Sequence, residues 1–256
     1  MLFRSETDEP YLFSHASEDE NGSLSVTMPM AHLIPSSYIH NLKEMFGKND
    51  KFDFKRIENG PDKDGIRNFI RDLFIYDGIR GIQYCGEETT ILAEQLVDLP
   101  RYKGMDETEI PVTNPNVIKW LYLARQLGKL NTKDKKTLSQ VYLYQFYEAL
   151  KTAKFIAPMR LHGYDQLLED NPQTEIEPNI PFDLAMQPGK TKELTLQVYT
   201  DWKRLRKHRG EDCKGLIVTL DEQLEYYDVV INPGGHPMAA AMITEELYNE
   251  VKKKTV

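Results

Sequence analysis

The residues best suited to chemistry lie near the C-terminus, where the letters VVINPGGHPM occupy positions 229–238. An imidazole such as that of His236 can act as a general base or bind a metal, and paired glycines can offer backbone N–H groups to a phosphate. The alternative is a sharp corner between two strands, because glycine tolerates positive φ and proline cannot donate to a sheet. Turns of this composition are common, so the pattern favours the corner, with His236 as a solvated turn residue.

Motif searches give no support to a phosphate or metal site at this turn. The sequence contains neither Gly-x-x-x-x-Gly-Lys-Ser/Thr nor Gly-x-Gly-x-x-Gly, the two glycine motifs that cradle phosphates. No second His or Cys stands two or four residues from His236, so His162 or His208 could join it only through the fold. We therefore expect no metal and no cofactor.

Two other groups of residues could carry chemistry, and each has a structural alternative. The carboxylates of Asp221, Glu222 and Glu225 could serve glycoside or metal chemistry, but they also fit a capped, exposed helix. Cys85 beside Gly86 could be a nucleophile, yet it lacks a recognisable His partner and is expected to be a partly buried thiol. The signatures of serine hydrolases, zinc proteases and kinases are missing. We expect that the protein is not an enzyme. A hydrolase or transferase with a novel active site is kept as an alternative hypothesis.

Two segments carry a strong charge of one sign. Basic residues recur over 203–209, which could bind phosphate or nucleic acid or form a solvated helix face that pairs with acids. The stretch 161–189 is predicted to be a long acidic loop, because it has acids and prolines but neither Lys nor Arg. Its acids are Asp165, Glu169, Asp170, Glu175, Glu177 and Asp183. The net charge of −8 argues against nucleic-acid and anionic-lipid partners.

The composition is that of a folded globular protein in a reducing compartment. Of the 256 residues, 40% are hydrophobic, which is enough for a sizeable core. Cys85 and Cys213 are too few for a disulfide framework and are expected to be reduced thiols in the cytoplasm. The acidic N-terminus lacks the apolar region of a signal peptide, and the apolar run 238–243 is too short to cross a bilayer.

The sequence predicts alternating helices and strands in the C-terminal half. These elements must position the candidate residues. Amphipathic spacing predicts a helix over 138–153. Thr200 or Asp201 is placed to cap a second helix over 202–208. Apolar runs predict strands over 154–160, 194–200, 215–219 and 229–232. A hairpin at the Gly-Gly corner requires an antiparallel pair, so the predicted fold is α/β (α+β) with a mixed sheet flanked by helices.

The charged segment 130–136 lacks apolar periodicity and is the candidate boundary between two domains, 1–130 and 131–256. Both halves contain a strand that starts at glycine, GIQY and GLIV, then acids and a short helix, AEQLV and DEQLEYY. We interpret the N-terminal domain as a diverged copy of the second, in tandem with it. Chance similarity is the alternative, because a repeat normally shows a sustained period.

Four pieces of the C-terminal half occur in an order that resembles a known family. They are TLSQVYLYQFYEALKTA before FIAPM, LTLQVYT before DWKRLRK, GLIVTLDEQLEYYD, and VVINPGG before TEEL. This order resembles the N-terminal domain of the SseB family, the enhanced serine sensitivity proteins, over residues 137–251. The Phe-Thr-Ser of that family reads Val198-Tyr199-Thr200 in this chain, and the acidic loop is longer than is usual there.

The resemblance implies a non-enzymatic, cytoplasmic binding or regulatory protein, linked by the family's name to serine tolerance. Its ligand would be a small molecule or a protein, with a homodimer as an assembly to test. The alternative is a protein-interaction module that docks a basic partner through the acidic loop 161–189. The candidate binding residues are Tyr199, Thr200, Asn232, Gly234, Gly235 and His236.

Overall fold

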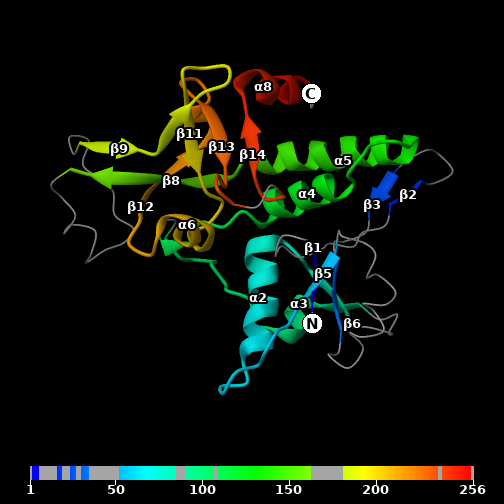
Figure 1. Ribbon diagram of the computed structural model, residues 1–256. Coiled ribbons are helices and arrows are strands. Elements are labelled where there is room, and N and C mark those ends of the chain that lie inside the picture. Colours follow the sequence, from blue (N-terminus) through cyan, green and yellow to red (C-terminus); the bar gives the residue numbers. More distant parts are fainter. Residues whose placement is uncertain are drawn as a thin grey trace. The chain divides into compact units, whose positions relative to one another are not determined.

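The chain folds as an α+β protein, as the sequence predicts (Figure 1). It is described by a computed structural model over residues 2–5, 16–18, 24–26, 30–34, 52–84, 90–106, 109–162, 181–235 and 238–254. Cys85, His236 and the acids between 163 and 180 lie outside the described residues. Within the described residues, no helix is long and apolar enough to cross a membrane.

The chain forms two compact units. Unit 1 comprises Met1–Pro100 and Ile118–Gln145, and unit 2 comprises Arg101–Val117 and Phe146–Val256. The chain therefore passes between the units more than once, whereas the sequence predicts a single boundary within 130–136. That charged segment contains the start of a helix, α5, which begins at Lys133.

Unit 1 contains a five-stranded mixed sheet in the order β5-β1-β4-β6-β7. The strands are β1 (Leu2–Ser5), β4 (Met30–Leu33), β5 (Phe52–Lys55), β6 (Gly81–Tyr84) and β7 (Thr90–Leu92). β1 is antiparallel to β5 and β4, β4 is parallel to β6, and β6 is antiparallel to β7. A separate antiparallel pair joins β2 (Ala16–Glu18) to β3 (Leu24–Val26).

The helices of unit 1 bury an apolar face against this sheet. Ile70 on α2 (Gly65–Asp77) packs with Ile82 on β6 and with Ala93, the first residue of α3 (Ala93–Leu96). α2 ends at Gly78, whose φ of 70° is left-handed and suits glycine. Two further helices, α4 (Pro115–Gln126) and α5 (Lys133–Leu150), contribute residues to both units.

Unit 2 contains two sheets, one mixed in the order β10-β11-β13-β14 and one antiparallel in the order β12-β8-β9. The strands are β8 (Lys154–Leu161), β9 (Phe182–Leu184), β10 (Met186–Pro188), β11 (Leu194–Val198), β12 (Lys214–Thr219), β13 (Asp228–Ile231) and β14 (Ala241–Ile243). β11 runs parallel to β13, and β13 is antiparallel to β14 (Figure 1). The predicted mixed sheet with a hairpin at the Gly-Gly corner is thereby confirmed.

Backbone hydrogen bonds join the two sheets of unit 2. Ile156 on β8 and Tyr199 after β11 exchange two N–H···O bonds of 2.9 and 2.8 Å. Ala185, between β9 and β10, donates to the Pro158 carbonyl and accepts from the Gln197 N–H, both at 3.0 Å. The prediction of one loop over 161–189 is therefore wrong for β9 and β10, because β9 pairs with β8 and β10 pairs with β11.

The two mixed sheets share an order of pairings. In unit 1, β1-β4-β6-β7 are joined by antiparallel, parallel and antiparallel pairs in turn. In unit 2, β10-β11-β13-β14 repeat that order, and the strands follow one another along the chain in the same sequence. The tandem-copy interpretation stays a prediction, because a shared pairing order can arise without duplication.

A buried carboxylate fixes the loop between β10 and β11. Asp228, at the start of β13, is fully buried, and its Oδ2 accepts the backbone N–H groups of Lys190, Thr191 and Lys192 at 3.0, 2.7 and 3.2 Å. The Thr191 hydroxyl donates to Oδ1 at 2.5 Å. Burial raises the pKa of this carboxyl, but the hydrogen bonds from Thr191, Lys192 and Lys190 outweigh it and hold the pKa below its ordinary value.

The same loop is held from its other side by the Lys192 ammonium group. It donates to the carbonyls of Leu224 and Glu225, and it lies 2.9 Å from a carboxylate oxygen of Glu245 in α8 (Glu245–Lys254). Three segments of unit 2 therefore meet at one cation. Because an ammonium carries three donors and no acceptor, these three oxygens can satisfy it completely.

Replacing Asp228 with alanine should lower the free energy of unfolding by about 3 kcal/mol, because four donors lose a charged acceptor. Asp228→Asn keeps one acceptor oxygen and should cost less. Urea unfolding followed by circular dichroism measures both variants. An alanine variant as stable as the wild type would contradict this account of the loop.

The stability of the protein should also depend on pH through Asp228. Its folded pKa lies below the unfolded value of about 3.9, so the carboxylate contributes stability above that pH and loses it as pH falls through the folded pKa. The stability difference between the wild type and Asp228→Asn should stay level from about pH 7 to about pH 5 and shrink below about pH 4. A difference that widens in acid would show that the pKa is raised instead.

Candidate functional site

The parallel pairing of β11 and β13 brings most of the predicted site residues together. The pair ends with Val198 opposite Ile231, so Tyr199 and Thr200 emerge beside the turn that starts at Asn232. Parallel strands end at the same edge of a sheet, which explains how segments more than thirty positions apart meet. The site consists of this edge, the turn, and helix α6 (Trp202–Arg209).

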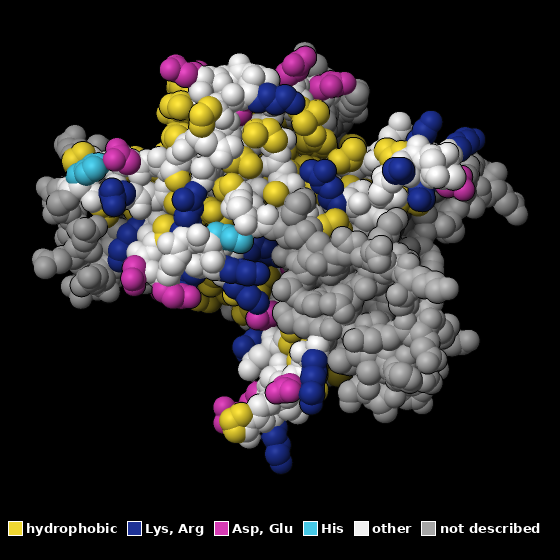
Figure 2. Space-filling model, in the orientation of Figure 1, with side chains coloured by type: hydrophobic (Ala, Val, Ile, Leu, Met, Phe, Trp, Pro, Cys, Tyr) yellow, Lys and Arg dark blue, Asp and Glu magenta, His cyan; other side chains and the backbone are white. Residues whose placement is uncertain are grey.

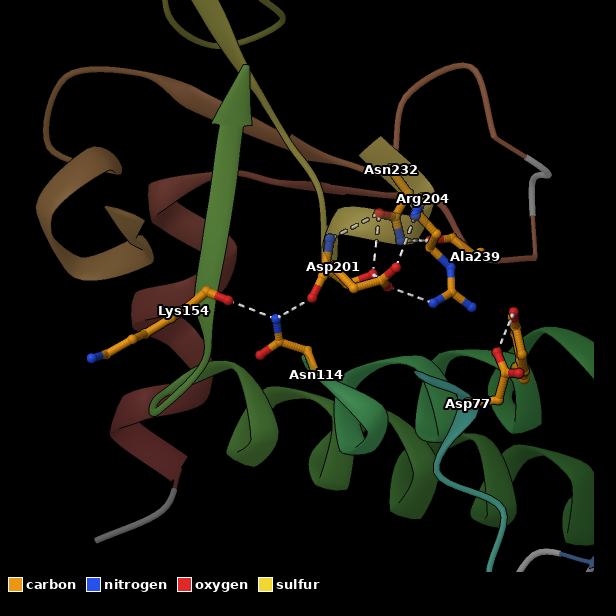
Figure 3. Close-up of polar contacts among 9 residues, drawn as sticks. Asp77, Asn114, Lys154, Asp201, Arg204, Asn232 and Ala239 are labelled. Carbon is orange, nitrogen blue, oxygen red and sulfur yellow. Dashed lines mark hydrogen bonds and ion pairs between the residues drawn. The ribbon is translucent and has the colours of Figure 1, made fainter. Parts of the chain in front are cut away.

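Asn232 connects the two strand ends through its side chain (Figure 3). Its Oδ1 accepts the Thr200 N–H at 3.0 Å, and its Nδ2 donates to the Ala239 carbonyl at 3.0 Å. Its own N–H donates to the Val198 carbonyl at 2.7 Å. The residue is 1% exposed and has a φ of 50°, a left-handed conformation that asparagine tolerates better than most residues. Its amide is therefore used inside the protein.

Thr200 and Asp201 extend this network to α6. The Thr200 hydroxyl lies 2.8 Å from Oδ2 of Asp201 and 3.3 Å from Oδ1 of Asn232. Asp201 caps α6 as predicted, with Oδ1 accepting the Arg204 N–H at 2.8 Å. The Arg204 guanidinium lies 2.6 Å from Oδ2 (Figure 3). Asp201 is fully buried, and an ion pair in such a place is costly to break because the remaining charge stays buried.

Asn114 ties a third segment of unit 2 to the same place. Its Nδ2 donates one hydrogen to the Lys154 carbonyl at 2.6 Å and the other to the Thr200 carbonyl at 2.8 Å (Figure 3). The backbone before α4, the start of β8 and the end of β11 are thus joined by one amide group. Sequence reasoning missed Asn114, because 86 positions separate it from Thr200 and no local pattern marks it.

The outer part of the site is formed by the half-buried His208 and the exposed Arg209, which pack against the buried Tyr199. Tyr199 is buried, and its hydroxyl donates to the Pro233 carbonyl at 3.1 Å and accepts from Nε of Arg209 at 3.2 Å. The His208 ring stacks on the Tyr199 ring with 6.1 Å between centroids. Arg209 also donates to Gln197 on β11. The last residues of α6 are thereby fixed against the edge of the sheet.

The glycines of the turn have different roles. Gly234 is exposed and has a φ of 73°, which L-residues other than asparagine rarely adopt. Gly235 donates to the Asn232 carbonyl at 3.2 Å, and a Cβ there would lie 3.2 Å from Nε2 of His208. The missing side chain at Gly235 therefore lets the turn approach His208 closely. His208 and Arg209 are the site residues that sequence reasoning did not include.

The other candidate groups have structural surroundings. His162 lies 2.8 Å from Asp183, and both side chains are exposed. The helix expected near Asp221, Glu222 and Glu225 is α7 (Leu220–Gln223), but its cap is Thr219, which forms a capping box with Glu222, so Asp221 lies within the helix and Glu225 beyond it. Burial raises the pKa of the Cys213 thiol and Arg209 lowers it less, so the net shift is upward. Among residues with described side chains, no three His, Cys, Asp or Glu gather as a metal site would require.

Asn232→Ala should lower the free energy of unfolding by about 3–5 kcal/mol, because buried partners lose their hydrogen bonds and alanine resists positive φ. Asn232→Gly is the matched control, since it removes the same amide but accepts the φ. It should be about 1 kcal/mol more stable than the alanine variant. Chemical unfolding measures both. If the glycine variant matched the wild type, the amide hydrogen bonds would contribute no stability.

Comparison with known proteins identifies no relative of this chain. The chain matches no model of a protein family, no curated protein and no solved structure. The resemblance to the SseB family therefore stays a prediction from the quoted motifs. What can be said of the site rests on its geometry.

Proposed function

We propose that this chain is a non-enzymatic binding or regulatory protein of the SseB type, which acts in the cytoplasm. Its ligand, a small molecule or a protein segment, would contact the exposed side of the turn 232–235 and the neighbouring His208 and Arg209. A role in serine tolerance is part of the proposal only through the family resemblance. The protein could act as a monomer or as a homodimer.

This proposal rests on the observation that the polar side chains at the turn form hydrogen bonds within the protein. Asn232, Thr200 and Asp201 are buried, and their hydrogen bonds go to the protein itself. A catalytic group must reach the reacting atoms, which these side chains do not do in this arrangement. They hold a surface in place, and a surface held rigidly suits recognition because less ordering is required on binding.

The chemistry of the exposed groups limits the classes of ligand that suit the turn. Arg209 contributes a guanidinium fixed by Tyr199 and Gln197, and His208 contributes an imidazole fixed by ring stacking. Both are donors suited to carboxylate or phosphate oxygens. Amino acids and phosphorylated metabolites are therefore the classes to test first.

The alternative function, docking of a basic partner through the acidic stretch 161–189, stays a prediction. Most of its acids lie at positions outside the described residues. Asp183, which lies on β9, is paired with His162.

A thermal-shift screen against amino acids including serine, nucleotides, phosphorylated metabolites and divalent cations tests the proposed function. A ligand at about 100 times its Kd stabilises the folded state by about 2.7 kcal/mol. That stabilisation raises the Tm by several degrees for a chain of this size. We expect a hit among the anionic compounds.

Matched histidine variants locate the site. His208→Gln should abolish the rise in Tm that the ligand causes. His162→Gln should preserve it, because His162 follows the end of β8 that lies farther from this turn. A shift that is lost in His162→Gln and kept in His208→Gln would place the ligand elsewhere. If no compound in the panel raises the Tm, the small-molecule form of the proposal is overturned.

A further inference from the structure

Helix α6 is strongly basic. Five of its eight residues are Lys or Arg, and its last turn consists of Arg206, Lys207, His208 and Arg209. Cations near a helix C-terminus are favourable, which accounts for the last turn. The helix dipole does not account for Lys203, which lies in the first turn, where a positive charge is disfavoured.

We define the basic face of α6 as its four exposed cations. They are Lys203, Arg206, Lys207 and Arg209. Lys203 and Lys207 are four positions apart, and Arg206 is three positions from both Lys203 and Arg209, so these like charges are neighbours on the helix surface. α6 contains no acid that could relieve their repulsion. Figure 2 shows Lys and Arg side chains beside a histidine in the middle of the visible face.

Two acids among the described residues lie near this face, and neither holds Arg206 or Lys207 firmly. Asp201 is fully buried and pairs with Arg204, which is not part of the basic face. Glu211 lies 4.0 Å from Arg206, at the limit of an ion pair, and both side chains are exposed. Exposed pairs of this kind are weak, so an incoming carboxylate can compete for Arg206.

The helix and two of its guanidinium groups are held in position. Leu205 is fully buried in a cluster with Ile156 and Tyr199, which anchors α6 to the sheets. Arg206 lies over the Trp202 ring at 5.6 Å, and Arg209 is bound to Tyr199 and Gln197. Fixed, planar guanidinium groups lose little freedom when they bind a carboxylate.

We propose that the basic face of α6 docks an acidic segment of a partner protein. The basic face is complementary to a carboxylate-rich peptide, and a short peptide can confine its contacts to that face, whereas a long nucleic acid also meets the repulsion of a chain with a net charge of −8. Arg206 lies over the Trp202 ring, and this half-buried ring packs against the cluster that contains Leu205, so it is not a free stacking surface for a base. The apolar residues of α6 face the protein, which leaves no apolar side to enter a membrane.

This surface goes beyond the proposed ligand site, because Arg206 and Lys207 take no part in the contacts at the turn among the described residues. Fluorescence polarisation of a labelled glutamate-rich peptide with the full chain tests it. A peptide with glutamine in place of glutamate is the control for charge. We expect the acidic peptide to bind, the control peptide not to bind, and the affinity to fall as salt increases.

The variant Arg206→Gln with Lys207→Gln should weaken peptide binding roughly tenfold. The matched control, Lys133→Gln with Lys136→Gln, removes the same net charge from exposed positions on α5 and should change binding less than about twofold. All four positions are exposed, so both double variants should fold. Circular dichroism checks that they do.

Three outcomes would overturn the proposal. They are no binding of the acidic peptide, equal weakening by both double variants, or tighter binding of an RNA oligonucleotide or of anionic lipid vesicles than of the peptide. The ligand screen with His208→Gln tests the turn separately. Loss of peptide docking with an intact ligand shift, or the reverse, therefore shows which of the two proposals has failed.

Discussion

The architecture of unit 2 depends on the hydrogen bonds of one buried asparagine side chain. A parallel strand pair normally ends where its backbone ladder ends, and the last N–H and C=O groups then need other partners. The amide of Asn232 supplies them, because it accepts from Thr200 and donates to the Ala239 carbonyl before β14. The positive φ of this residue turns the chain, so one residue both continues the ladder and starts the corner.

The two ends of β13 follow a common rule. At its start, the Asp228 carboxylate collects three backbone N–H groups of a loop, and at its end Asn232 bridges two chain segments. In both places a side chain adds hydrogen bonds to the backbone pairing of β13 with β11 and β14. Each site is fully buried, where unmade hydrogen bonds are most costly. The strand is thus fixed at both ends by side chains whose replacement should be felt across the unit.

Sequence patterns predicted the elements with strong local signals and missed those defined by distant partners. The predicted helix over 202–208 agrees closely with α6, because Asp201 caps it and Gly210 follows it. β9 and β10 were missed, since strands of three residues within an acidic, proline-containing stretch have no clear period. The turn 232–235 was predicted as a corner, but no local pattern indicates that His208 lies beside it. Partners such as Asn114 are set by tertiary structure alone.

Arg209 belongs both to the basic face of α6 and to the turn site, and this shared membership has a thermodynamic consequence. Its guanidinium contacts Tyr199, whose hydroxyl in turn contacts Pro233. An occupant that displaces Arg209 from one side alters what the other side presents. Linkage then requires reciprocity, so each occupant changes the affinity for the other by the same factor. A shared arginine would therefore couple binding at the two neighbouring surfaces. The coupling is positive if the first occupant leaves the guanidinium where the second needs it, and negative if it does not.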